Sequence, residues 1–286
     1  MPEQSNFTSP TDGATIATYA WGSELEEPRG VVQIAHGIAE HALRYDRLAQ
    51  ALVRAGYRVR ANDHRGHGKS VASADQLGHF SFPALVADVA AFGASIKDDA
   101  PGVPLFLIAH SMGSFAAQEV ILDHPGPYAG VVLSGSTSLD VLAAGLSQAE
   151  GPVGLEAFNE GFEHRTGYEW LSRDEVEVDA YVADPLNGFD LPDDAVPQLF
   201  GSAARLADPE ELFRINSDLP ILIVSGDADP LAGKGQLVQL LGQRYTAAGV
   251  KDVTVKLYPG ARHEIFNETN RDQITADVIG WLQQHG

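Results

Sequence analysis

The chain has 286 residues, which is enough for one large domain or for a core domain with an insertion. Its formal net charge of −20 argues against binding to nucleic acid phosphates, and the absence of cysteine excludes disulfides, a thiol nucleophile and thiolate metal sites. No stretch approaches the ~20 apolar residues that span a bilayer, and the first residues lack a signal-peptide pattern. We therefore expect a soluble protein with no membrane span and the cytoplasm as its default location.

Short β-like runs alternate with helix-like stretches, the pattern of an α/β fold with a largely parallel sheet. A first strand is expected before the turn at 11–13. The later strands are TIATYAW (15–21), GVVQIA (30–35), YRVRAND (57–63), PLFLIA (104–109), AGVVLSG (129–135), PILIVSG (220–226) and VTVKLYP (253–259). The expected helices cover 41–56, 82–96, 114–124, 234–248 and a last segment ending near Gln284.

The alternation stops after Gly135 and resumes near residue 208. We expect a core built from residues 1–135 and 208–286, with residues 136–207 inserted as a mostly helical lid. The acidic segment 172–194 is predicted to be a solvated surface, with repulsion of anionic ligands as the alternative. Apolar lid residues either form a wall for a bound apolar ligand or pack the lid onto the core. These residues are Leu139, Val141, Leu142, Leu146, Val153, Leu155, Phe158 and Phe162.

The stretch AHSMGS (109–114) joins an expected strand directly to a helix. A turn this sharp forces Ser111 into a strained conformation with its hydroxyl above the sheet, and the residues two before and two after it must be small. Gly113 meets this requirement, and Ala109 exceeds glycine by one methyl group. Ser111 is therefore either a nucleophile or a helix cap, and the residues that could act with it decide between the two.

A serine nucleophile needs a histidine as base and a carboxylate that fixes the histidine tautomer. His263 lies in the loop after the last expected strand, at the sheet edge where Ser111 is expected. The loop after the preceding strand offers Asp227 and Asp229. We favour Asp229 because it reaches further over the site, which leaves Asp227 to stabilise the turn or to face solvent.

Backbone amides must also meet the charge that develops on the substrate carbonyl oxygen. Met112, the residue after the nucleophile, supplies one amide. The second is expected from the loop after GVVQIA, where Gly37 lets the backbone turn inward and Ile38 follows. We therefore predict an oxyanion hole made by the amides of Ile38 and Met112.

Four segments together resemble the α/β-hydrolase family, in particular its monoacylglycerol lipase and lysophospholipase-like branch. They are HGIAEHALRY (36–45), NDHRGHGKS (62–70), AHSMGS (109–114) and RHEIFNE (262–268), with SGDADP as the acid loop. The resemblance implies an α/β-hydrolase fold with a mostly parallel central sheet, flanking helices and an inserted lid. It matches Ile38 to an oxyanion donor and Asp229 to the catalytic acid. It also implies that Glu40 and Arg44 arrange polar contacts at the head-group end of the substrate.

His64 and His67 raise the question of a metal site, since the two histidines lie three residues apart. No helix places both rings on one face and no nearby acidic cluster completes a site, so we predict a structural loop. The sequence has no P-loop and no dinucleotide-binding fingerprint. We therefore expect neither a metal nor an organic cofactor.

These features predict a serine hydrolase of carboxylic esters that acts through an acyl-enzyme, with a monoacylglycerol or a similar single-chain ester as substrate. The expected partner is a small ester with an apolar acyl chain, and transient contact of the lid with a lipid surface is a further hypothesis. Lactones, aromatic monoesters and peptide-like amides could use the same triad. A binding protein that retains the fold without catalysis is the alternative from another class.

Overall fold

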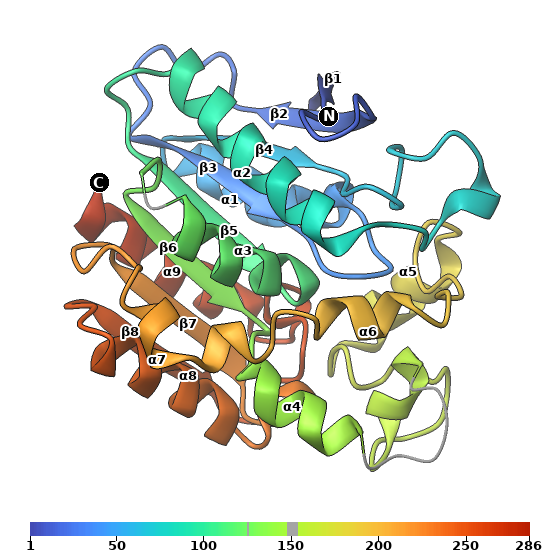
Figure 1. The fold of residues 1–286 in the computed structure, drawn as a ribbon. Helices are drawn as coiled ribbons and strands as arrows, with labels where there is room; N and C mark the ends of the chain where they lie inside the picture. Colours follow the sequence, from blue (N-terminus) through green and yellow to red (C-terminus); the bar gives the residue numbers. More distant parts are fainter. Residues whose placement is uncertain (125, 148–153) are drawn as a thin grey trace.

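The computed structural model describes residues 1–124, 126–147 and 154–286. The described residues form an eight-stranded sheet in the order β1-β2-β4-β3-β5-β6-β7-β8 (Figure 1). The β1–β2 and β2–β4 pairs are antiparallel and all other pairs are parallel, so the predicted largely parallel sheet is confirmed. The strands are β1 Glu3–Thr8, β2 Thr15–Trp21, β3 Gly30–Ala35, β4 Tyr57–Asn62, β5 Leu105–His110, β6 Gly130–Ser134, β7 Ile221–Gly226 and β8 Val253–Tyr258.

Helices cover both faces of this sheet. They are α1 Asp46–Arg54, α2 Phe82–Asp99, α3 Met112–Asp123, α4 Leu139–Leu146, α5 Glu175–Ala183, α6 Ala195–Leu199, α7 Pro209–Leu212, α8 Gln236–Ala247 and α9 Arg271–His285. Alternate residues of β5 point to opposite faces: Leu105 and Leu107 pack in the cluster with α2, α3 and α8, and Phe106 and Ile108 in the cluster with α1 and α9. The sheet is therefore buried on both sides, as a parallel sheet requires.

Residues 136–207, which the sequence predicts to be a lid and which keep that name below, lie between β6 and β7. Its described residues form α4, α5, α6 and the short 3-10 helices Leu155–Asn159 and Arg205–Ala207, with no strand among them. Figure 1 shows α4, α5 and α6 together beyond one end of the sheet, the end at which β6 stops. None of the helices in the described part of the chain is long and apolar enough to cross a membrane.

Two expected helices begin later than the sequence suggested. The segment expected as a helix over 41–56 starts as the 3-10 turn Ala42–Tyr45 and becomes α1 at Asp46, because the Ala42 amide is bound to the Asp63 carboxylate. The helix expected from 234 starts at Gln236, because the three residues before it all have positive φ. Both shifts belong to loops at the carboxyl ends of strands, where tertiary contacts override helix propensity.

Candidate active site

Ser111 occupies the turn between strand β5 and helix α3. Its φ of 50° and ψ of −122° form a conformation that residues other than glycine rarely adopt. The side chain stands at the N-cap position of α3 but makes no capping hydrogen bond, and the residue is 6% exposed. This geometry fits the strained elbow and not the helix cap that was its alternative.

The small residues on either side of Ser111 have different reasons to be small. A Cβ on Gly113 would come within 2.4 Å of the Ala35 carbonyl oxygen, so only glycine fits between α3 and β3. Ala109 is fully buried on β5, and its methyl group packs in the apolar core. The additional methyl group is therefore accommodated in the elbow.

His263 and Asp229 form a buried pair. His263 Nδ1 lies 2.9 Å from Asp229 Oδ2, and the two residues are 2% and 1% exposed. Asp229 Oδ1 accepts a hydrogen bond from the Leu231 amide at 2.9 Å, which fixes the carboxylate. When Nδ1 donates to Asp229, Nε2 is the nitrogen left to accept a proton. Asp227 instead accepts from the Gly260 amide at 2.6 Å and stabilises a turn.

The surroundings of His263 favour its protonated form. Burial acts against the imidazolium, but the Asp229 carboxylate, its hydrogen bond and the nearby Glu264 and Glu40 outweigh this and raise the pKa of His263 above 6.5. The ring of His110 lies 4.7 Å from that of His263, between centroids. Burial, together with His263, lowers the pKa of His110, so His110 is neutral beside the base.

Ser111 and His263 line the same small cavity, of about 10 Å³, which is about the space of one water. Its walls also include Ile38 and Glu40 from the loop after β3 and Trp170 from the lid. The structure therefore brings the expected nucleophile, base and oxyanion loop to one place. Asp229 joins this group through its hydrogen bond with Nδ1 of His263.

The loop after β3 places Ile38 in the wall of this cavity, beside Ser111 and His263. The Gly37 amide donates to Glu40 Oε1 at 2.5 Å and is thus occupied. Within the described ranges, the amides of Ile38 and Met112 donate to no protein acceptor. Ala39 has a φ of 52°, and its carbonyl oxygen accepts from the Tyr181 hydroxyl at 2.8 Å. Two amides are therefore available where an oxyanion is expected.

Glu40 and Arg44 are held in a buried network. Arg44 Nη1 donates to Glu40 Oε2 at 2.7 Å, and Nη2 donates to Glu264 Oε2 at 2.7 Å. The Arg44 guanidinium also lies 4.7 Å from the centre of the Tyr181 ring. Glu40 lines the cavity at Ser111. The Arg44 guanidinium is instead surrounded by the side chains of Glu40, Glu264 and Tyr181.

Glu264, Trp170 and Tyr181 belong to the site, and sequence reasoning did not single them out. Glu264 follows His263 in the segment RHEIFNE, and an acidic residue next to the base was a usable signal. Trp170 and Tyr181 lie in the lid, where the sequence carries no motif to align. Only the fold shows that these two aromatic residues contact the catalytic loops.

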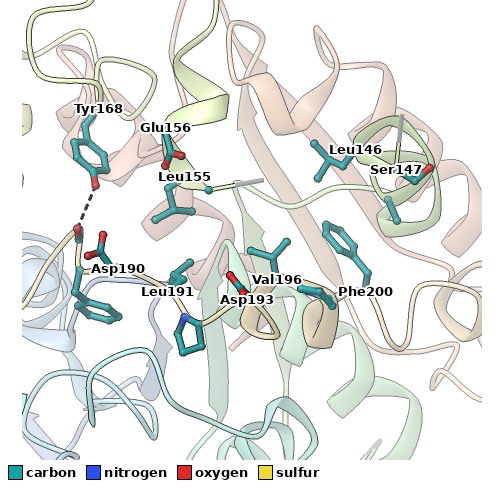
Figure 2. A pocket seen from close by; sticks show the side chains of 16 residues that line it. Leu146, Ser147, Leu155, Glu156, Tyr168, Asp190, Leu191, Asp193, Val196 and Phe200 are labelled. Atoms are coloured by element: carbon teal, nitrogen blue, oxygen red, sulfur yellow. Dashed lines mark hydrogen bonds between the residues drawn. The ribbon is translucent and has the colours of Figure 1, made fainter. Parts of the chain in front are cut away.

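An apolar channel of about 40 Å³ leads from Ser111 toward the lid. A larger cavity of about 710 Å³ lies next to it, and Leu155, Val196 and Phe200 line both. Figure 2 shows this larger cavity, where Leu191 and Val196 stand among the carboxyl groups of Glu156, Asp190 and Asp193. Segment 136–207 thus surrounds a cavity with apolar walls and acidic side chains, next to the channel at Ser111.

The apolar lid residues divide between the two roles considered for them. Leu142, Leu155 and Phe158 line the channel at Ser111, and Leu146 lines the larger cavity. Leu139 is buried in the core, and Phe162 packs against the Arg262 guanidinium at 4.7 Å. Val141 is exposed. Val153 lies outside the described residues.

The order of the strands, with a serine elbow after β5 and an aspartate and a histidine after β7 and β8, defines the α/β-hydrolase fold. The chain belongs to the family whose model is described as "Serine aminopeptidase, S33", which matches residues 26–270. The resemblance seen in the sequence and the predicted fold class are thereby confirmed.

Relatives in this family agree over most of their length. The chain is 33% identical to a monoacylglycerol lipase of Mycolicibacterium smegmatis, over 96% of this chain and 94% of that one. It is 31% identical to the monoglyceride lipase of Homo sapiens, over 90% and 83%. A solved structure of a thermostable carboxyl esterase from Bacillus coagulans superposes with a TM-score of 0.85 at 25% identity, covering 99% and 98% of the chains.

Proposed function

We propose that this chain is a serine ester hydrolase whose substrate is a monoacylglycerol or a similar ester with one acyl chain. One observation carries the proposal: Ser111, in a strained turn and free of any capping bond, shares a cavity with a histidine bound to a buried aspartate. This is the arrangement that activates a serine hydroxyl. The relatives named above, two lipases and an esterase, support ester bonds as the target.

In the proposed mechanism, Ser111 attacks the ester carbonyl while His263 Nε2 takes its proton. Asp229 holds the imidazole tautomer and compensates the imidazolium, and the amides of Ile38 and Met112 bind the oxyanion. His263 then protonates the leaving alcohol. A water molecule, activated by the same histidine, releases the acid and restores Ser111.

The substrate class is supported by the space around Ser111. The apolar channel lined by Leu142, Leu155 and Phe158 suits an acyl chain, and residues 136–207 would act as the lid over a core of 1–135 and 208–286. Three exposed valines, Val141, Val176 and Val182, lie on this lid. They support brief contact with a lipid surface, which sedimentation with lipid vesicles tests.

Labelling with a fluorophosphonate tests the mechanism. The probe should modify Ser111 in the wild type and nothing in Ser111→Ala. Asp229→Asn should lower kcat by about 10⁴-fold, because the histidine tautomer is lost. Asp227→Asn should retain near-normal kcat, because Asp227 is bonded to a turn amide. Labelling of another residue, or loss of activity in Asp227→Asn alone, contradicts the assignment.

A substrate panel tests the class of ester. It contains monoacylglycerols and p-nitrophenyl esters of graded chain length, monoalkyl phthalates, lactones and aminoacyl anilides. The highest kcat/KM should belong to single-chain esters. A clear preference for anilides contradicts the lipase assignment and favours the peptidase activity in the family's description.

A further inference from the structure

Two loops from separate strands meet at the Ser111 cavity. The loop after β3 carries Ile38, and the loop after β8 carries His263. Arg44 joins them: Nη1 lies 2.7 Å from Glu40 Oε2 and 2.5 Å from Glu264 Oε1, and Nη2 lies 2.7 Å from Glu264 Oε2. We call these three residues, Glu40, Arg44 and Glu264, the inter-loop ion bridge.

Every oxygen of the two carboxylates in the inter-loop ion bridge is used. Glu40 Oε1 accepts from the Gly37 amide at 2.5 Å and from the Tyr45 hydroxyl at 2.7 Å. Glu264 Oε2 accepts from Asn267 at 3.0 Å as well as from Arg44. Glu40 is 2% and Glu264 6% exposed. Buried ion pairs of this kind contribute little net stability over apolar packing, and fixing one arrangement is the better account of the bridge.

We propose that Glu264 and Arg44 are positioning residues: they hold the Ile38 amide in register with His263 through Glu40 and the Gly37 amide. The inference rests on the proposed function, since it takes Ile38 as an oxyanion donor and His263 as the base. Bidentate pairing between a guanidinium and a carboxylate fixes both distance and plane. The bridge therefore sets where the oxyanion hole stands relative to the proton acceptor, which a strained loop alone would not do.

The lid fixes the same loop from the opposite side. The Tyr181 ring lies against the Arg44 guanidinium, and its hydroxyl donates to the Ala39 carbonyl oxygen at 2.8 Å. The Gly188 amide donates to that same oxygen at 2.9 Å. The Ala39–Glu40 peptide group is thus held by the lid and the His36–Gly37 peptide group by Glu40, so the loop is fixed on both sides of the Ile38 amide. Tyr181 is a third positioning residue for the same amide.

The bridge also acts on His263 through charge. Burial opposes ionisation of Glu264, but Arg44 and its hydrogen bonds outweigh burial and lower the pKa of Glu264 to about 2. The charged groups facing His263 are Asp229, Glu264 and Glu40, and the neutral His110 and Trp170 rings cover it. Removing the charge of Glu264 should therefore lower the pKa of His263.

The test compares Glu264→Gln with wild type on a p-nitrophenyl ester, with kcat, KM and the pH profile measured. We expect kcat to fall about 10-fold to 100-fold with KM within about 3-fold, because a misplaced donor is lost from the transition state and not from binding. The acid limb of kcat/KM should move to lower pH. Asp88→Asn removes another buried carboxylate bonded to an arginine, at 2.8 Å from Arg65, and should lower Tm without changing kcat or KM.

Tyr181→Phe is the second variant, because it removes one hydroxyl and keeps the ring. It should lower kcat about 3-fold to 10-fold, and combined with Glu264→Gln the losses should be less than multiplicative. Unchanged kcat and an unmoved acid limb in folded Glu264→Gln overturn the inference. Failure of fluorophosphonate to label Ser111 in the wild type overturns the proposed function instead, so the two failures are distinguishable.

Discussion

The indole ring of Trp170 lies against the imidazole of His263, with the ring centroids 4.9 Å apart and the planes inclined by 37°. The His263 amide also donates to the Trp170 carbonyl oxygen at 3.3 Å. A residue of segment 136–207 therefore packs directly on His263, the proposed base. Trp170 lines both the cavity at Ser111 and the apolar channel, so it lies between the polar part of the site and the channel proposed for the acyl chain.

Trp170→Ala should lower kcat about 10-fold and the free energy of unfolding by about 3–5 kcal/mol, because a large buried ring is lost beside the base. Trp170→Phe should keep most activity. In the described part of the chain the indole N–H has no acceptor, so phenylalanine breaks no hydrogen bond. The kcat values are calculated per active site, with the sites counted by titration with fluorophosphonate. Full kcat in Trp170→Ala would show that the ring does not support the base.

Gly135 stands beside both active-site imidazoles. A Cβ there would lie 2.7 Å from His110 Cε1 and 2.9 Å from His263 Cε1, at a φ of 54°. Gly135→Ala should therefore lower kcat at least 10-fold by displacing His263. Gly13→Ala is the matched control: its φ of 76° carries similar strain, but nothing lies within 4 Å. It should lose about 1 kcal/mol of stability with unchanged kcat.

The buried histidines predict loss of stability in acid. Burial, with the neighbouring His67, lowers the pKa of His64 to about 3, and burial lowers that of His67 to about 4. The folded protein keeps both neutral while the unfolded chain takes up protons below pH 6.5. The free energy of unfolding should therefore be full above pH 6.5 and fall toward pH 4, by about 1.4 kcal/mol per pH unit for each histidine.

His67→Phe should flatten this slope by one histidine's share. The ring of His67 already packs against Phe80 and Phe189 at 5.4 Å, so a phenyl ring suits the site. Urea titrations at several pH values measure the slope. The exposed His79 provides the control, and His79→Gln should leave the slope unchanged. An equally steep slope in His67→Phe would contradict the prediction.

The acidic walls of the lid cavity predict selection by charge. Glu156, Asp190 and Asp193 line the larger cavity (Figure 2), which shares three lining residues with the channel at Ser111. An ester with an anionic head group should therefore show lower kcat/KM than a neutral one of equal chain length. The double variant Asp190→Asn, Asp193→Asn should narrow the difference, as should higher salt. A preference for the anionic ester in the wild type would refute charge selection.

The sequence predicted the sheet, the serine elbow and the positions of His263 and Asp229, because buried strands and the residues directly after them leave a local signal. Asp229 was favoured over Asp227 because it reaches further over the site. In the structure Asp229 is hydrogen-bonded to His263, whereas Asp227 accepts from the Gly260 amide. The function of segment 136–207 could not be predicted from the sequence. Tyr181 and Trp170 act through contacts with loops more than 90 residues away, and no local pattern encodes such pairings. The resemblance gave Arg44 a part in arranging polar contacts at the head-group end of the substrate, and in the structure its guanidinium donates to Glu40 and Glu264.

The hydrogen bonds from Tyr181 and Gly188 to Ala39 have a consequence for protein engineering. Exchanging lids between relatives is an obvious route to new chain-length preferences, with the cuts made near residues 136 and 207. Such a transplant would remove Tyr181 and Gly188, which bind the Ala39 carbonyl oxygen. It would also remove the Trp170 ring, which packs on His263. A transplant should therefore leave the segment from residue 169 onward in the host and keep Asn159, whose Oδ1 accepts from the Trp170 amide at 2.9 Å.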